Sequence, residues 1–173
     1  NLILCGMLVS SLFNALVSFT KFVADTETKL PAITFWLMGT LSGTTLKDLS
    51  VFWLFLPALA ILMLGRWKVN ILSLGDDEAR MLGVNVLFYR WLIIACATLL
   101  TSLSVSVAGN IGWIGLVVPH FARMVTGSNY GKVLPASALI GSAFMLLVDT
   151  AARMLYTVEV PLSIITAVIG APF

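Results

Sequence analysis

The chain has 173 residues, of which 60% are hydrophobic and only 10% are charged, and its formal net charge is +2. A soluble domain usually carries about 25% charged residues, so this composition argues against a soluble domain with an unusually apolar core. The small net charge gives no sign of a nucleic-acid-binding surface. A mean hydropathy of +1.04 fits a chain whose solvent is the lipid bilayer, and we expect an all-α polytopic transmembrane bundle, with residues 1–173 forming one membrane domain.

The first part of the chain predicts two spans separated by a short helix. Residues 1–20 are uncharged and long enough to cross a bilayer. Pro31 suits the first turn of a second helix, and Gly39 interrupts the apolar stretch that follows it. That helix is therefore expected to be interfacial or re-entrant. Residues 49–65 form the second expected span, which Pro57 is expected to kink.

The first span carries polar side chains that recur at helical spacing. In lipid, such a face turns toward other helices or toward a water-filled path. Interhelical hydrogen bonding and lining of a path are equal alternatives here. The four residues are Ser10, Ser11, Asn14 and Ser18, of which the last three share a face.

The second part begins with an amphipathic segment, residues 69–90, in which Gly75 and Gly83 are expected to mark turns and which is too polar to span a membrane. An uncharged run too long for one helix follows, with a break expected at Gly109–Gly112 and Pro119 as a second punctuating residue. We expect spans at 91–108 and, shorter, at about 112–126. Further spans are expected at 135–156 and from Pro161 onward, after a tight turn at 158–161, which gives about five to six spans.

Lysine and arginine residues suggest an orientation, because cytoplasmic loops carry an excess of them. If the 66–90 loop faces the cytoplasm, alternation of the spans puts six basic residues inside and four outside. The inner group is Arg66, Lys68, Arg80, Arg90, Arg123 and Lys132, and the outer group is Lys21, Lys29, Lys47 and Arg153.

The most informative stretch of the amphipathic segment is residues 74–83. Its pattern predicts a short helix that ends in Gly83, with Asp76 and Asp77 near its start, where carboxylates interact favourably with the helix dipole. Such a helix can dock into a groove on a soluble partner. The alternative is a solvated loop helix with no partner.

Four sequence blocks resemble, in order and spacing, the membrane permease subunits of ABC importers for iron–siderophores, haem, cobalamin and related metal chelates (the FecCD/BtuC-like, type II importers). The resemblance covers the second half of a family chain of about ten spans, so we expect this sequence to be a piece of a longer permease. The blocks are LGDDEARMLGVNV, GNIGWIGLVVPHFARMV, LPASALIGSAFMLLVDTAARM and VEVPLSIITAVIGAPF.

The resemblance implies two docking regions. Within the cytoplasmic loop 69–90, the 74–83 stretch looks like the coupling helix that sits in a cleft of the ATPase subunit. Its residues are Leu74, Gly75, Asp76, Asp77, Glu78, Ala79, Arg80, Leu82 and Gly83, with Asp77 where glutamate is common. Arg153 resembles the external arginine that contacts the substrate-binding protein. Asp149, four residues earlier on the same predicted helix, can also pair with it.

Other matched residues are expected to be structural. They are Gly112, Gly115, Pro119, His120, Arg123, Asp149, Glu159 and Pro161. We expect His120 to make a structural polar contact, Arg123 to anchor the cytoplasmic end of its helix, and Glu159 to mark a helix start. One histidine with no Cys, Asp or Glu nearby in sequence cannot build a metal site, and no cofactor is expected. No phosphate-binding loop of the Walker type occurs, so ATP hydrolysis is expected on a partner rather than on this chain.

The resemblance implies a permease subunit, not an enzyme, that works in the cell inner membrane. Its expected partners are a second permease copy, two cytoplasmic ATPase subunits and an external binding protein. An iron–siderophore is the expected cargo, with haem, cobalamin or an oxyanion as other possibilities. The first span would line the path, and the 30–43 helix would belong to the outer gate. Alternatives are a secondary transporter driven by an ion gradient, with helix breaks at Gly109–Gly112, and a non-transporting assembly subunit.

Overall fold

The computed structural model describes residues 2–155 and 160–170, and within these ranges the regular secondary structure is helical. The chain divides between Leu37 and Met38 into two compact units. The first unit contains α1 (Leu2–Val23) and the short helix α2 (Lys29–Leu37). The expected short helix around Pro31 is therefore present, and it begins at Lys29.

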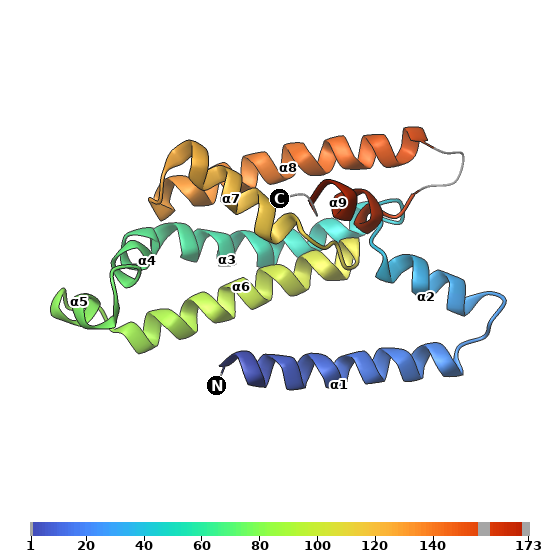
Figure 1. Cartoon of the computed structure of the whole chain (residues 1–173), viewed down its shortest axis with the longest axis horizontal. Coiled ribbons are helices and arrows are strands. Elements are labelled where there is room, and N and C mark those ends of the chain that lie inside the picture. The colour runs from blue at the N-terminus through green and yellow to red at the C-terminus, as the bar shows by residue number, and fades with distance from the viewer. Residues whose placement is uncertain (1, 156–159, 171–173) are drawn as a thin grey trace. The chain divides into compact units, whose positions relative to one another are not determined.

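The second unit contains the remaining helices, which Figure 1 shows in chain order. They are η1 (Leu46–Val51), α3 (Phe52–Leu64), α4 (Arg66–Leu72), α5 (Asp76–Met81), α6 (Val86–Ala108), α7 (Ile114–Thr126), α8 (Tyr130–Leu155) and α9 (Leu162–Gly170). Within this unit, α3 packs most extensively on α6, and α7 on α8.

Four helices in the described part of the chain are long and apolar enough to cross a bilayer: Ile3–Val23, Leu46–Leu64, Val86–Ala108 and Tyr130–Met154. They confirm the polytopic all-α expectation. Helix α7 has 13 residues, or about 20 Å at 1.5 Å per residue, which is less than the roughly 30 Å of hydrocarbon in a bilayer. The short fourth span expected at about 112–126 is therefore present as α7, but it is too short to cross the bilayer completely.

Two helices begin earlier than the uncharged runs predicted, because their starts are set by caps. Helix α6 starts at Val86, where the Asn85 side chain accepts a hydrogen bond of 3.1 Å from the Phe88 backbone N–H. Helix α8 starts at Tyr130, where the Asn129 side chain accepts a hydrogen bond of 2.9 Å from the Gly131 backbone N–H. A capping asparagine satisfies an N–H group that the helix itself leaves unpaired.

The break expected at Gly109–Gly112 is confirmed: the chain breaks between α6 and α7, where Gly109 has φ +71° and Trp113 has φ +68°. Helix α7 continues through Pro119, so this second punctuating residue does not end the helix. The Ile114 N–H donates to the Gly112 carbonyl at 2.8 Å and closes a γ-turn at Trp113. Pro57 also lies inside a helix, α3, and the kink there stays a prediction.

The segment before η1 joins the ends of two helices in the second unit. The Met38 and Gly39 carbonyls accept hydrogen bonds from the first N–H groups of α9, those of Ser163 and Leu162, at 3.1 and 2.9 Å. The Thr40 N–H donates to the carbonyl of Ala108, the last residue of α6, at 3.0 Å. This junction, residues 38–40, therefore satisfies backbone groups at both helix ends.

Replacing Gly39 by alanine is expected to destabilise this junction. Gly39 has φ +79°, and an added Cβ would lie 2.9 Å from Ile111 Cγ1, so we expect a loss of about 1–3 kcal/mol. Thermal unfolding of the detergent-solubilised protein measures it. Gly43→Ala, in the same loop and with nothing within 4 Å of the new Cβ, is the matched control. Equal melting temperatures for the two variants would contradict the prediction.

Candidate partner-docking surfaces

The stretch predicted to couple to a partner contains a short helix, α5, held between two glycines with positive φ. Gly75 precedes α5 with φ +128° and ψ +161°, a region that essentially only glycine occupies. At the other end, the Val84 N–H donates to the Ala79 carbonyl and the Gly83 N–H to the Arg80 carbonyl, both at 2.9 Å. This pair of bonds is a Schellman motif with Gly83 at φ +74°. The turns expected at both glycines are confirmed.

The loop that carries α5 has a small apolar core of its own. Ala79 is 0% exposed, and it is buried with Ile71, Val84 and Val86. Ala79 was expected among the partner contacts, but a residue this buried cannot reach a partner and instead anchors α5. Sequence position alone did not separate the inner from the outer face of so short a helix.

The outer side of this loop combines exposed apolar and charged groups. Leu74, Met81 and Leu82 are 64%, 80% and 57% exposed. Asp77 and Glu78 are exposed in the first turn of α5. Met81 was not among the expected contacts, although its place in the same stretch pointed to it. We call this set, Leu74, Asp76, Asp77, Glu78, Arg80, Met81 and Leu82, the coupling surface.

One ion pair ties the coupling surface to the neighbouring span. Arg90 Nη2 lies 2.7 Å from Asp76 Oδ1, with both side chains about half exposed. Asp76 is the first residue of α5 and Arg90 lies in the first turns of α6, so the pair joins the two helices. Because it is exposed, it contributes at most about 1 kcal/mol. The sequence placed Arg90 on the cytoplasmic side but did not predict its partner.

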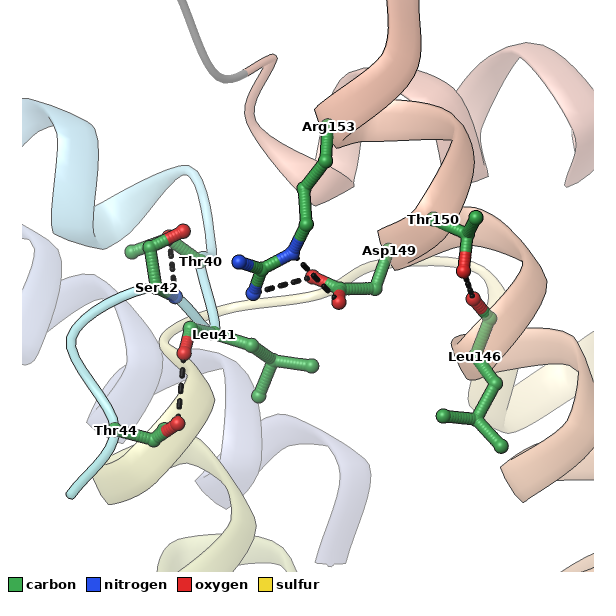
Figure 2. Close-up of polar contacts among 8 residues, drawn as sticks. All are labelled: Thr40, Leu41, Ser42, Thr44, Leu146, Asp149, Thr150 and Arg153. Atoms are coloured by element: carbon green, nitrogen blue, oxygen red, sulfur yellow. Dashed lines mark hydrogen bonds and ion pairs between the residues drawn. The ribbon is translucent and has the colours of Figure 1, made fainter.

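The second surface lies at the last turns of α8, where Figure 2 shows Arg153 reaching toward the loop at 40–44. Arg153 Nε and Nη2 donate to the two Asp149 carboxylate oxygens at 2.9 and 3.3 Å. The arginine side chain is 49% exposed and the aspartate 22%. The expected pairing of Asp149 with Arg153 is confirmed, and about half of the arginine side chain stays accessible. We call these two residues the outer pair.

A buried apolar cluster lies next to the outer pair. Val148 and Ala152 on α8 and Leu162 on α9 are 2%, 3% and 2% exposed. Residues 40–42, the outer pair and the start of α9 enclose a small hollow. The core holds α8 and α9 together, and the two charged side chains stand at its edge.

The remaining predicted site residues are less informative. His120 is exposed on α7, and its side chain makes no hydrogen bond with any residue in the described ranges, so its expected structural contact stays a prediction. Arg123 lies in the last turn of α7, near its helix end as expected. Gly112 and Gly115 have open space around them. The Pro161 carbonyl accepts from the Ile164 N–H at 3.1 Å at the start of α9, whereas Glu159 and the first half of the turn expected at 158–161 lie outside the described residues.

The polar face predicted on the first span is present on α1. Ser10, Ser11, Asn14 and Ser18 are all exposed in the described chain. The Ser18 hydroxyl donates to the Asn14 carbonyl at 2.9 Å, which satisfies it within its own helix. Lining of a path by this face stays a prediction.

The coupling surface and the outer pair lie at opposite ends of the second unit. Figure 1 shows α4, α5 and the start of α8 at one end and the end of α8 with α9 at the other. Helix α8 has 26 residues, so it spans about 39 Å between these ends. The arrangement suits a protein that contacts separate partners on two sides of a membrane.

Comparisons with known proteins agree with this geometry. A model of the FecCD transport family matches residues 1–173. The molybdate import system permease protein MolB of Haemophilus influenzae is 46% identical over 172 residues, which cover 99% of this chain and 51% of that protein. A protein of Helicobacter pylori named as a probable iron chelatin transport system permease is 41% identical over 178 residues, covering 100% and 53%. The cobalamin import system permease protein BtuC of Halobacterium salinarum is 42% identical over 176 residues, covering 99% and 46%.

A solved structure described as an inward-facing conformation of a metal-chelate type ABC transporter superposes with a TM-score of 0.94 at 46% identity, covering 99% of this chain and 56% of that one. The chain spans about half the length of the curated relatives it matches. Four candidate spans, a helical fold and a family match over the whole sequence lead to one identification. The chain belongs to the FecCD transport family, and its relatives described above are named as permease proteins of import or transport systems.

Proposed function

We propose that this chain supplies the second half of a permease subunit in an ATP-driven importer of the cell inner membrane. Two cytoplasmic ATPase subunits would bind two permease copies at their coupling surfaces, and an external binding protein would dock at the outer pair. ATP hydrolysis belongs to the ATPase subunits in this proposal. The observation that carries it is α5, a short helix locked between two glycines that presents apolar and acidic side chains away from the spans.

The exposed apolar groups support a protein partner at the coupling surface. Leu74, Met81 and Leu82 are large, more than half exposed, and close together in the chain. Exposed apolar groups clustered with charged residues are a common signature of an interaction site. A short amphipathic helix that fits a groove on the partner is the matching recognition mode.

The charge distribution supports the cytoplasmic location of this surface. In the second unit, the helix ends around α4 and α5 carry Arg66, Lys68, Arg80, Arg90, Arg123 and Lys132, whereas the other end carries Lys47 and Arg153. Cytoplasmic loops carry the excess of lysine and arginine. In the second unit, basic residues at the two ends stand at six to two, a stronger excess than the six to four counted over the whole sequence.

The named relatives support a class of cargo rather than a single compound. Their names refer to molybdate, an iron chelate, cobalamin and haem. We propose that the cargo is a metal chelate or a metal oxyanion, and the iron–siderophore expectation stays one member of this class. Identification of the binding protein's ligand by mass spectrometry would choose among them.

Charge reversal on the coupling surface is expected to impair the ATPase interaction. In the complete permease that contains this chain, Asp77→Lys combined with Glu78→Lys should weaken binding of the ATPase subunit by about tenfold or more, equal to about 1.4 kcal/mol. Titration of the ATPase subunit onto permease in nanodiscs measures this. Glu27→Lys, at an exposed carboxylate in the loop before α2, is a charge-reversal control outside the coupling surface. Uptake that follows a proton or sodium gradient without ATP would contradict the proposed function.

Loss of the external guanidinium is expected to weaken docking of the binding protein. Arg153→Ala should raise the Kd of the binding protein for the transporter by about tenfold. Arg153→Lys should recover only part of the affinity, because an ammonium cannot form the two-pronged contact of a guanidinium. Surface plasmon resonance on the assembled transporter measures both variants. An unchanged affinity in Arg153→Ala would remove the outer pair from the docking surface.

A further inference from the structure

Two asparagines from distant parts of the chain join α4 to the start of α8. The Asn70 side-chain amide donates from Nδ2 to Asn129 Oδ1 at 3.0 Å. Asn70 Oδ1 accepts the Tyr130 backbone N–H at 2.8 Å. Asn129 Oδ1 also accepts the Gly131 backbone N–H at 2.9 Å. The three bonds form one network, which we call the asparagine joint.

The asparagine joint is a helix cap shared between two helices. The first N–H groups of any α-helix lack partners within the helix. Asn129 satisfies one of them in α8 as an ordinary capping residue does. The preceding donor, the Tyr130 N–H, is satisfied by Asn70, which belongs to α4. The start of α8 is therefore completed by a side chain from the segment that leads to the coupling surface.

Close packing and buried apolar residues flank the asparagine joint on both helices. A Cβ added at Gly131 would lie 3.1 Å from Arg66 Cδ and 3.2 Å from Asn129 Oδ1, so the arginine stem already lies against the α8 backbone. Ile71, next to Asn70, and Val133, one turn into α8, are each 6% exposed. Asn70 is half-buried and Asn129 is exposed, so the buried neighbours on each side and the bonds across the joint limit independent movement of α4 and α8.

The joint lies between the two proposed docking surfaces. Asn70 is in the last turn of α4, and its carbonyl accepts the Ser73 hydroxyl at 2.6 Å just before Leu74 begins the coupling surface. The opposite end of α8 carries the outer pair. Movement of α5 and α4 that is transmitted through the joint would displace α8 as one rod.

We propose that Asn70 and Asn129 are positioning residues that couple the ATPase-facing surface to the binding-protein-facing end through α8. This inference rests on the proposed function, because it requires an ATPase at the coupling surface. Coupling of this kind travels through hydrogen-bonded networks and rigid helices, and it must be demonstrated by perturbing them.

Hydrogen exchange tests the proposal without knowledge of the cargo. The complete permease, assembled with its ATPase subunits in nanodiscs, is compared in the nucleotide-free and the ATP–vanadate-trapped state. In the unmodified complex, exchange at 74–83 and at the outer end of α8, residues 144–155, should both change, the latter by about fivefold or more. In Asn70→Ala and Asn129→Ala the change at 74–83 should persist, and the change at 144–155 should fall below about twofold.

Conservative variants separate coupling from simple loss of a cap. Asn129→Asp keeps the acceptor for both Gly131 and Asn70, so its response at 144–155 should match that of the unmodified complex. Asn70→Asp keeps the acceptor for Tyr130 but has no donor for Asn129, so its response should be lost. Ser104→Ala, which removes a hydrogen bond of 2.8 Å within α6 alone, should leave the response unchanged. If the alanine variants assemble poorly, the comparison of Asn70→Asp with Asn129→Asp tests the coupling inference by itself.

The outcomes distinguish the two proposals. No change at 74–83 between the nucleotide-free and the ATP–vanadate-trapped state of the unmodified complex would overturn the proposed function, and the coupling inference with it. A change at 74–83 with an undiminished response at 144–155 in Asn70→Ala and Asn70→Asp would overturn the inference alone. Equal losses of the response at 144–155 in Asn70→Asp and Asn129→Asp would also overturn the inference. Asn129→Asp keeps the acceptor for Gly131 and Asn70, so the inference predicts no loss in that variant.

Discussion

The need to satisfy backbone groups at helix ends governs this structure. A chain in lipid has no water to complete these groups, so its spans must be helical and their ends must find partners. Here the partners are specific: asparagine side chains at the starts of α6 and α8, the carbonyls of residues 38 and 39 at the start of α9, and a Schellman motif after α5. Each of these caps fixes the end of a helix relative to its surroundings.

Fixed helix ends explain why the two candidate docking surfaces are well defined. The coupling surface is presented by a helix of only six residues, which would be marginal in isolation. Gly75, the Schellman motif and the burial of Ala79 hold it in place. At the other end, the junction at residues 38–40 ties the start of α9 to the end of α6, and the apolar cluster next to the outer pair holds α8 and α9 together. Preorganisation of this kind lowers the entropic cost of binding a partner.

Local sequence signals predicted the four long apolar helices, the amphipathic loop with its two glycine turns, and the pairing of Asp149 with Arg153. Each depends on residues close together in the chain. Hydropathy did not predict that α6 and α8 start before their uncharged runs, because polar caps determine those starts. It did not predict the inward-facing Ala79 either. The bond between Asn70 and Asn129 joins residues 59 positions apart, and no local pattern encodes such a contact.

The second unit consists of two packed helix pairs, α3 with α6 and α7 with α8. At one end, the pairs are joined by the strained turn at Trp113 and by the Thr40 bond to Ala108 beside α9. At the other end, α4, which follows α3, is joined to α8 by the asparagine joint. Packed helices move as rigid bodies more readily than they deform, so relative motion of the two pairs must be accommodated at these ends. An apolar cavity of about 260 Å³ among α7, α8 and α9, lined in part by Trp113 and Gly170, leaves room for such repacking at the Trp113 end. At the opposite end, hydrogen bonds join Asn70 of α4 to Asn129 and Tyr130 at the start of α8, so under the coupling inference a displacement of α4 would be passed on to α8.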